Sequence, residues 1–255
     1  HFGVWPDAYY MSINQFDQDS FDWAGAGAVA FEREQMLQGL PARMVYFSLF
    51  DVNPAFGGQL PADLDGAVPP EGAPGLFLEA DDDAFGFPTD QLAGWEFDVD
   101  WTDPTASTFG NAGNPNWTLE TAAFDMDMCG FSRSCIPQPD TGVGLDTISD
   151  RLMHRVQYRN FGDHQSLVLN HTVDADGNDH AGIRWYELRS TDGGAVWDVE
   201  QQGTYAPDAE NRWMGSAAMD VSGNIAVGYS VASATTYPSI RVAGRLQGEP
   251  PGELP

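Results

Sequence analysis

The sequence has 255 residues, enough for one sizeable hydrophobic core, and its 42% hydrophobic content is too high for a disordered chain. The formal net charge is −27, from 38 acidic residues against 11 basic ones, all of them arginine. The electrostatic field of such a negative charge repels nucleic-acid phosphates and anionic lipid surfaces. No apolar run approaches the roughly 18 residues that span a bilayer. The composition therefore argues against nucleic-acid binding and membrane insertion.

The origin of the chain stays open at this level. Aspartate outnumbers glutamate 27 to 11 and lysine is absent, which is typical either of a saline habitat or of a GC-rich genome. The sequence opens on His1 without an initiator Met, and no signal peptide is visible, so we expect a processed product or a piece of a longer chain.

Short β-rich runs bounded by Gly, Pro, Asn and Asp predict an all-β fold. They recur as four similar units that begin near residues 3, 75, 161 and 215, each with a small-residue start, an apolar strand, a polar turn and a strand that ends in charge. Helical periodicity is scarce. Its best candidate is FEREQMLQGL at Phe31 to Leu40, which Gly39 and Pro41 stop at once.

Two stretches in the middle of the chain carry acidic or sulfur ligands. EADDDAFG, Glu79 to Gly86, packs four carboxylates, which suit either a calcium ion or an exposed loop kept apart by repulsion. Cys129 and Cys135 enclose CGFSRSC, short enough for a disulfide loop, which we expect, with two free thiols as the alternative. A structural metal site would need more Cys or His nearby.

Three turns follow in the second half. DADGND offers Asp174, Asp176, Asn178 and Asp179 as oxygen ligands for calcium, although a plain hairpin turn uses the same residues. In STDGGAVW, Ser190 and Asp192 can accept backbone hydrogen bonds, the two glycines allow positive φ, and Trp197 can anchor the turn in a core. MDVSGNIAVGYS predicts a tight hairpin.

The octet STDGGAVW resembles the Asp-box of sialidase-type β-propellers, in which it lies on the outer rim of a blade. GVWPDAYYMS, DRLMHRVQYRNFGDHQSLVLNHTV, RWMGSAAMDVSGNIAVGYSVAS and PSIRVAGRL resemble segments of uncharacterised secreted bacterial proteins of this group, whose members are longer. The resemblance implies a β-propeller of four-stranded antiparallel blades, of which this chain covers about four, and a secreted or periplasmic location. An all-β sandwich is the alternative fold.

In such a fold the starts of the innermost strands line the channel, where ligands bind. Asp7, Asp163 and His164 are then candidates for acid–base cleavage of a glycosidic bond, which needs two carboxylates. The candidate ligand-binding residues are Trp5, Tyr9, Tyr10 and Trp213, which could stack on sugars, and Arg155, Arg159 and Arg212, which could hold a carboxylate. The competing interpretation makes all of these residues structural.

We therefore expect a secreted, non-enzymatic propeller that binds a glycan or another extracellular surface component. The alternatives are a glycoside hydrolase or lyase with its site at the channel, and a structural subunit of an extracellular assembly that contacts other copies or missing flanking segments. The complete residue set of a sialidase is not found. No cofactor is required, and calcium is the ion that the acidic turns would take.

Overall fold

The computed structural model describes residues 1–255 and confirms the all-β prediction, because its one α-helix, α1 (Arg33–Leu37), has five residues. This helix lies inside the stretch that the sequence favoured, and it ends before Gly39, whose φ of +68° leaves the helical region. No helix of the structure has the length and apolarity needed to cross a bilayer.

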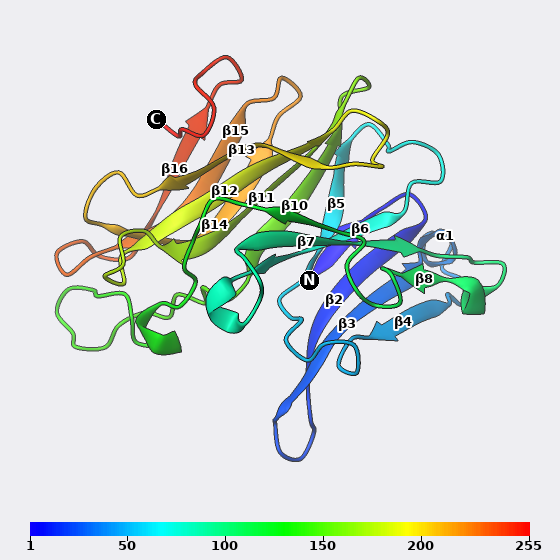
Figure 1. Cartoon of the computed structure of the whole chain (residues 1–255), viewed down its shortest axis with the longest axis horizontal. Helices are drawn as coiled ribbons and strands as arrows, with labels where there is room; N and C mark the ends of the chain where they lie inside the picture. The colour runs from blue at the N-terminus through cyan, green and yellow to red at the C-terminus, as the bar shows by residue number, and fades with distance from the viewer.

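The strands form four consecutive antiparallel meanders (Figure 1). The first comprises β1 (Phe2–Val4), β2 (Ala8–Phe16), β3 (Trp23–Glu32) and β4 (Met44–Ser48). The second comprises β5 (Leu60–Gly66), β6 (Gly75–Asp81) and β7 (Gln91–Asp98), with β8 (Thr108–Phe109) and β9 (Trp117–Glu120) both paired to β7. The third comprises β10 (Leu152–Asn160), β11 (Gln165–Asp174), β12 (Ala181–Ser190) and β13 (Asp198–Tyr205). The fourth comprises β14 (Asn211–Met219), β15 (Ile225–Ala232) and β16 (Ser239–Arg245).

The first strands of the meanders lie beside one another. β5 packs against β1, and β10 packs against β14. Between them β5 and β10 pair in parallel, which joins the second and third meanders into one nine-stranded sheet. Parallel pairing places the starts of β5 and β10 at the same edge of that sheet.

The observed starts correct two of the expected unit boundaries. The units expected near 75 and 161 coincide with β6 and β11, which are the second strands of their meanders. The first strands of these two meanders, β5 and β10, do not show the apolar pattern because they contain charged residues. In β10, Arg155 forms ion pairs with Asp63 and Asp65 of β5, and Arg159 lies 3.2 Å from Asp65. Charged residues that pair across a parallel ladder interrupt the apolar pattern by which a strand is recognised in the sequence.

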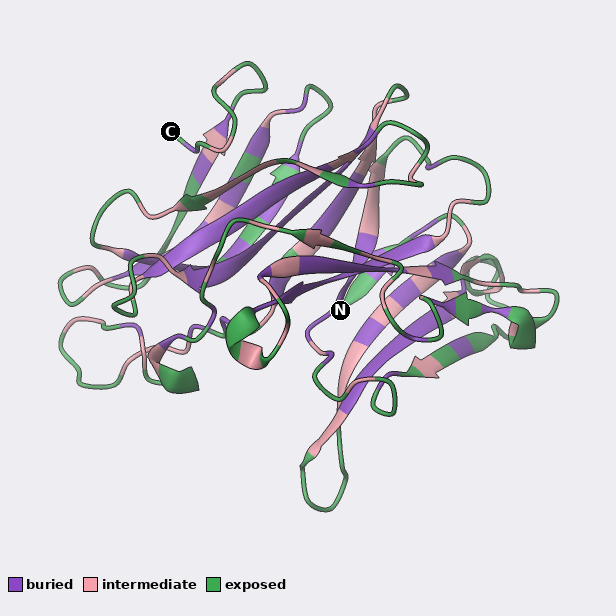
Figure 2. Ribbon diagram, in the orientation of Figure 1, coloured by how far each residue is buried: buried purple, intermediate pink, exposed green.

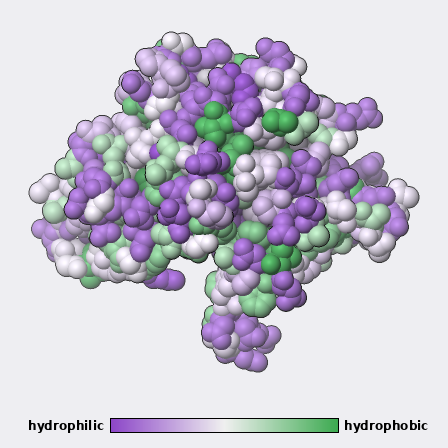
Figure 3. Space-filling view, viewed as in Figure 1, coloured by the Kyte–Doolittle hydropathy of each residue, from purple (hydrophilic) through white to green (hydrophobic).

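The core is continuous through the first three meanders. In Figure 2 the buried residues, drawn in purple, lie mostly on the strands, and the exposed residues, drawn in green, lie mostly on the loops. Trp5 of the first meander packs edge-on against Tyr158 of β10, with ring centroids 4.7 Å apart. A second cluster, which includes Val168 and Ile183, fills the space between the third and fourth meanders. The face drawn in Figure 3 is mainly hydrophilic, as the acidic composition requires.

Candidate ligand-binding cleft

The aromatic residues expected to stack on sugars are mostly core residues. Trp5, Tyr10 and Trp213 are 1%, 0% and 4% exposed, so their rings offer almost no accessible surface to a ligand. Each serves packing instead, and Trp5 donates its Nε1–H to Ala73 O at 3.1 Å. Tyr9 is half-buried, with the guanidinium of Arg33 5.6 Å from its ring centroid. A buried ring has no free face to offer a sugar.

The expected arginines already have partners. Arg155 and Arg159 neutralise aspartates of β5, as described above. Arg212 is 2% exposed, forms a bidentate pair with Asp208 at 2.8 Å and lies over the rings of Tyr205 and Tyr229. That pairing lowers the pKa of Asp208 to about 2. Arg212 thus already pairs with a carboxylate of its own chain, and its burial leaves it little accessible surface for a second one.

The proposed acid–base group is not assembled. Tyr10 donates its hydroxyl to Asp7 at 3.0 Å, and burial raises the pKa of Asp7. Asp163 lies exposed on the β10–β11 turn, where its contact with His164 at 2.8 Å lowers its pKa. Asp7 lines a hollow beside Pro69 and Asp98, and His164 lines a different one beside Glu187 and Arg189. The three side chains are thus not grouped around one reacting bond.

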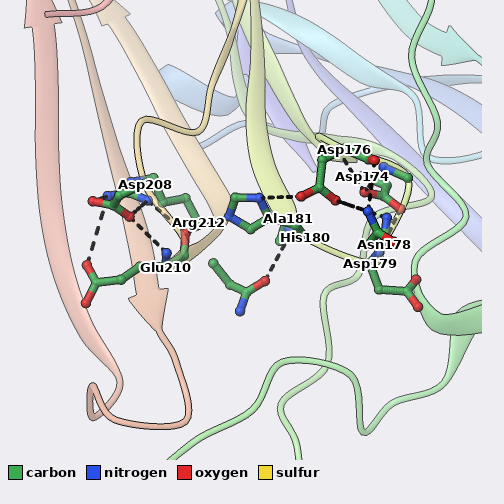
Figure 4. Close-up of polar contacts among 11 residues, drawn as sticks. Asp174, Asp176, Asn178, Asp179, His180, Ala181, Asp208, Glu210 and Arg212 are labelled. Carbon is green, nitrogen blue, oxygen red and sulfur yellow. Dashed lines mark hydrogen bonds and ion pairs between the residues drawn. The ribbon is translucent and has the colours of Figure 1, made fainter.

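The acidic side chains of the DADGND turn contact the backbone of the turn and, for Asp176, the ring of His180 at 3.4 Å (Figure 4). Asp174 accepts hydrogen bonds from the N–H groups of Asp176, Gly177 and Asp179, and the N–H of Asn178 bonds to Asp176. Asp179 accepts from the N–H of Cys129. These contacts engage carboxylate oxygens of Asp174, Asp176 and Asp179 in hydrogen bonds.

The carboxylates of the EADDDAFG stretch meet a further aspartate. Ligand oxygens of Asp82, Asp83 and Asp90 lie within 4.8 Å of one another. Asp82 and Asp90 each accept two backbone N–H bonds, among them those from Met126 to Asp82 at 2.6 Å and from Phe124 to Asp90 at 2.8 Å. The group thereby ties the segment after β9 onto the second meander.

A cleft of about 490 Å³ opens at the edge where β5 and β10 begin. We call it the aromatic cleft, because five of its thirteen lining residues are Phe16, Trp23, Phe85, Phe87 and Phe131. They come from the β2–β3 hairpin, which projects at the bottom of Figure 1, from the loop after β6 and from the disulfide loop. Three elements far apart in sequence therefore supply one apolar wall.

The aromatic rings are held by one another and by close backbone contacts. Phe16 packs edge-on against Trp23 with centroids 5.6 Å apart, and Phe85 lies 5.3 Å from Phe131. Trp23 donates its Nε1–H to Pro54 O at 2.7 Å. Gly57 lies close beneath the indole ring, and a Cβ there would lie 3.1 Å from it, a tight contact that the ring would have to relieve by a small shift. The rings remain open to solvent in part, with Phe16 59% and Phe131 49% exposed.

The disulfide loop contributes Phe131 to this wall. Cys129 and Cys135 are joined, with Cα atoms 5.7 Å apart. Cys129, Gly130 and Phe131 all have positive φ, between 52° and 59°. Left-handed backbone costs free energy at the two non-glycine residues, and the disulfide confines the loop that carries them.

The polar side of the cleft comes from the starts of the parallel strands. Asp150 and Arg151, which directly precede β10, form a bidentate pair at 2.9 and 2.6 Å. Asn14 of β2 accepts the N–H of Gly58 at 3.1 Å. The pair with Asp150 occupies two of the five guanidinium N–H donors of Arg151 and offsets its charge.

Glu79 of β6 also lines the cleft, and it is 4% exposed. Its Oε1 accepts the N–H of Gly57 at 2.9 Å, and its Oε2 is buried without a partner. Burial raises the pKa of Glu79 well above its ordinary value, and the charge of Asp81 raises it further. Burial thus favours the neutral form of the Glu79 carboxyl over its charged form.

Sequence reasoning missed this cleft for two reasons. It placed the strand starts near 75 and 161, whereas Gly57–Gly58 and Asp150–Arg151 precede the true first strands. It also considered EADDDAFG only as a calcium ligand set or as an exposed loop, and gave Phe85 no role. One pattern points to the site, namely phenylalanines at 85, 87 and 131 inside otherwise polar loops, where exposed aromatic groups mark binding surfaces.

Comparisons with known proteins add little to this geometry. No protein-family model and no curated protein matches the sequence. Among solved structures, the chain is similar to a protein of unknown function from Dyadobacter fermentans DSM 18053, with 12% sequence identity and a TM-score of 0.39. That match covers 95% of this chain and 63% of the other, so this chain spans less than two thirds of its length.

Proposed function

We propose that this chain is a secreted β-propeller domain that binds a glycan in the aromatic cleft. Two features support the propeller: four consecutive antiparallel meanders, and the lateral packing of β1 on β5 and of β10 on β5 and β14. A third is the STDGGAVW turn, which connects the last two strands of the third meander. The disulfide supports an oxidising, extracytoplasmic location.

The observation that carries the binding function is the solvent-open aromatic wall opposite polar side chains. Sugar rings present apolar C–H faces that pack on aromatic rings, while their hydroxyl groups need hydrogen-bond partners. Trp23 and Phe16 supply the former, and Asn14 and Asp150 supply the latter. The volume of about 490 Å³ lies in the range of small-molecule sites and suits one or two sugar units.

Removal of the aromatic wall tests this proposal. We expect Trp23→Ala and Phe16→Ala each to weaken the binding of any oligosaccharide found on a glycan array by about tenfold or more, measured by isothermal titration calorimetry. Phe2→Ala is the matched control, since Phe2 is 65% exposed and lies outside the cleft. Equal affinity of the two cleft variants and the wild type would place the glycan elsewhere.

A further inference from the structure

The first and fourth meanders differ in burial from the two meanders between them. β6, β11 and β12 are buried at nearly every position, so their sheet is covered on both faces. β2 and β15 instead alternate between buried and more exposed residues, so the first and fourth meanders are each covered on one face. Their uncovered sides, which we call the β4 face and the β16 face, belong to strands on opposite sides of the molecule in Figure 1.

The β4 face carries bulky apolar side chains where a solvated antiparallel sheet carries polar ones. Residues directly opposite each other in the ladders share a face. One row across the β4 face contains Phe2, Met11 and Tyr46, and the next contains Val4, Phe31 and Met44. Phe2 and Met44 are 65% and 58% exposed. No residue that β1–β4 direct to this face is charged, and the cation stacked at Tyr9 is Arg33 of the adjoining helix.

The β16 face is also uncharged, but it is made mainly of small residues. β14 and β15 contribute Ser216, Ala218, Ala226 and Gly228. On β16, Ile240 and Val242 lie on the same side and are 82% and 69% exposed. In a chain with 38 acidic residues, two exposed sheet faces without charge are unusual. Depletion of charge is typical of the core of a protein interface, and exposed apolar patches mark such surfaces.

We propose that the β4 face of one copy of this chain docks on the β16 face of a second copy. The contact goes beyond glycan binding and does not depend on it, since no residue of either face lines the aromatic cleft. It continues a packing that the chain already uses, because β14 covers β10, β11 and β12 with its other face. A meander of this chain is therefore a suitable cover for a meander of a second copy.

The two faces also complement each other. The β4 face presents large side chains, and the β16 face presents small residues beside Ile240 and Val242, so large groups of one face meet small groups of the other. Docking them brings no like charges into contact, although each copy carries a net charge of −27. Because the contact joins two different surfaces, each copy keeps one of the two faces available after a single contact has formed.

The salt dependence of self-association tests the nature of the contact. We expect the wild type to associate with increasing protein concentration in sedimentation equilibrium. Its dissociation constant should fall between about 0.01 M and about 1 M NaCl, because screening removes the repulsion between two acidic copies and leaves an apolar contact intact. A dissociation constant that rises over this series would show a contact made of ion pairs and would overturn the proposal.

Two double variants test which faces meet. Phe2→Lys with Met44→Lys alters the β4 face, and Ile240→Lys with Val242→Lys alters the β16 face. Each variant alone should self-associate at least about tenfold more weakly than the wild type, even though the added lysines reduce the net negative charge. An equimolar mixture should form a one-to-one pair, because each variant retains the face that the other has lost.

The charge-matched control is Phe21→Lys with Val196→Lys, at turn positions that are 77% and 56% exposed and lie outside both faces. It should associate at least as well as the wild type. A wild type that stays monomeric at all concentrations overturns the proposal, and so does a mixture of the two face variants that forms no pair. Full self-association of either face variant alone shows contact between identical faces and also overturns it. If a double variant does not fold, the single changes Met44→Lys and Ile240→Lys replace it.

Discussion

At the residue scale, the most informative feature is the pair of carboxyl groups on β6. Glu79 and Asp81 lie on the same face of a strand whose residues are all buried. Both have raised pKa values, with desolvation as the larger cause. Because desolvation disfavours the charged form, the native state holds these protons more tightly than the unfolded chain does.

Asp81→Asn should change the pH dependence of stability. The pKa of Asp81 is about 6 in the folded protein and 3.8 in the reference state, so its stabilising effect is complete below pH 3.8 and is lost as the pH rises through 6. Asparagine does not titrate and still offers Gln91 an oxygen. Relative to the wild type, the variant should gain up to about 3 kcal/mol in free energy of unfolding between pH 4 and pH 7. Urea unfolding at the two pH values measures this gain, and a constant difference between the curves would contradict it.

At the scale of elements, turns show most directly how local chemistry builds the fold. In the β12–β13 turn, Asp192 Oδ1 accepts bonds from the Ser190 hydroxyl and from the N–H groups of Ala195 and Val196, at 2.8 to 3.1 Å. The N–H of Gly194 bonds to Ser190 at 2.9 Å, and Trp197 is buried in the main core. The turn is thus closed by side chains and pinned by one large apolar group.

Asp192→Ala removes all three bonds to that carboxylate. Because the turn joins an edge strand to its sheet, we expect a lower free energy of unfolding than in the wild type, with a larger loss than in the neighbouring control below. Thr191→Ala, next to it and exposed, serves as the control and should change stability by less than about 0.5 kcal/mol. Chemical denaturation of both variants under the same conditions gives the comparison, and equal stabilities would show that the turn is held by Trp197 alone.

At the scale of the whole molecule, net charge opposes compaction. The 38 acidic residues outnumber the arginines by more than three to one, and 8 of the 11 arginines already form ion pairs. Most carboxylates are therefore left to repel one another across the surface. Such repulsion is long-ranged at low ionic strength, where the Debye length is about 30 Å at 0.01 M, and is short-ranged at about 3 Å in 1 M salt.

Salt should consequently stabilise the protein. Between 0.01 M and 1 M NaCl we expect the free energy of unfolding to rise by about 1 kcal/mol or more, which corresponds to a Tm increase of about 2–4 °C for a chain of this size. Differential scanning calorimetry over this series measures it. KCl at the same ionic strengths should give the same rise if screening is the cause. A Tm that falls with NaCl would mean that the ion pairs outweigh the repulsion.

The sequence by itself determined the β class, the short helix and the hairpin turns, because each depends on neighbours within a few residues. Asp174 and Asp192 act on backbone groups two to five positions away, and spacing alone reveals such contacts. The burial of the aromatic residues expected to stack on sugars could not be predicted from spacing in this way. The sequence around Trp5 and Trp213 is compatible both with a ring that faces a channel and with a ring that fills a core.

Only the tertiary structure decided where the cleft lies and which groups form it. The charges of β5 and β10 hid these strands from the pattern, since the partners Asp65 and Arg159 are 94 positions apart in the chain. Parallel pairing of those two strands then brings their starts to one edge, where Gly57 meets Trp23 and Glu79. The pKa of a buried carboxyl group is raised by its surroundings, and long-range packing alone sets those surroundings.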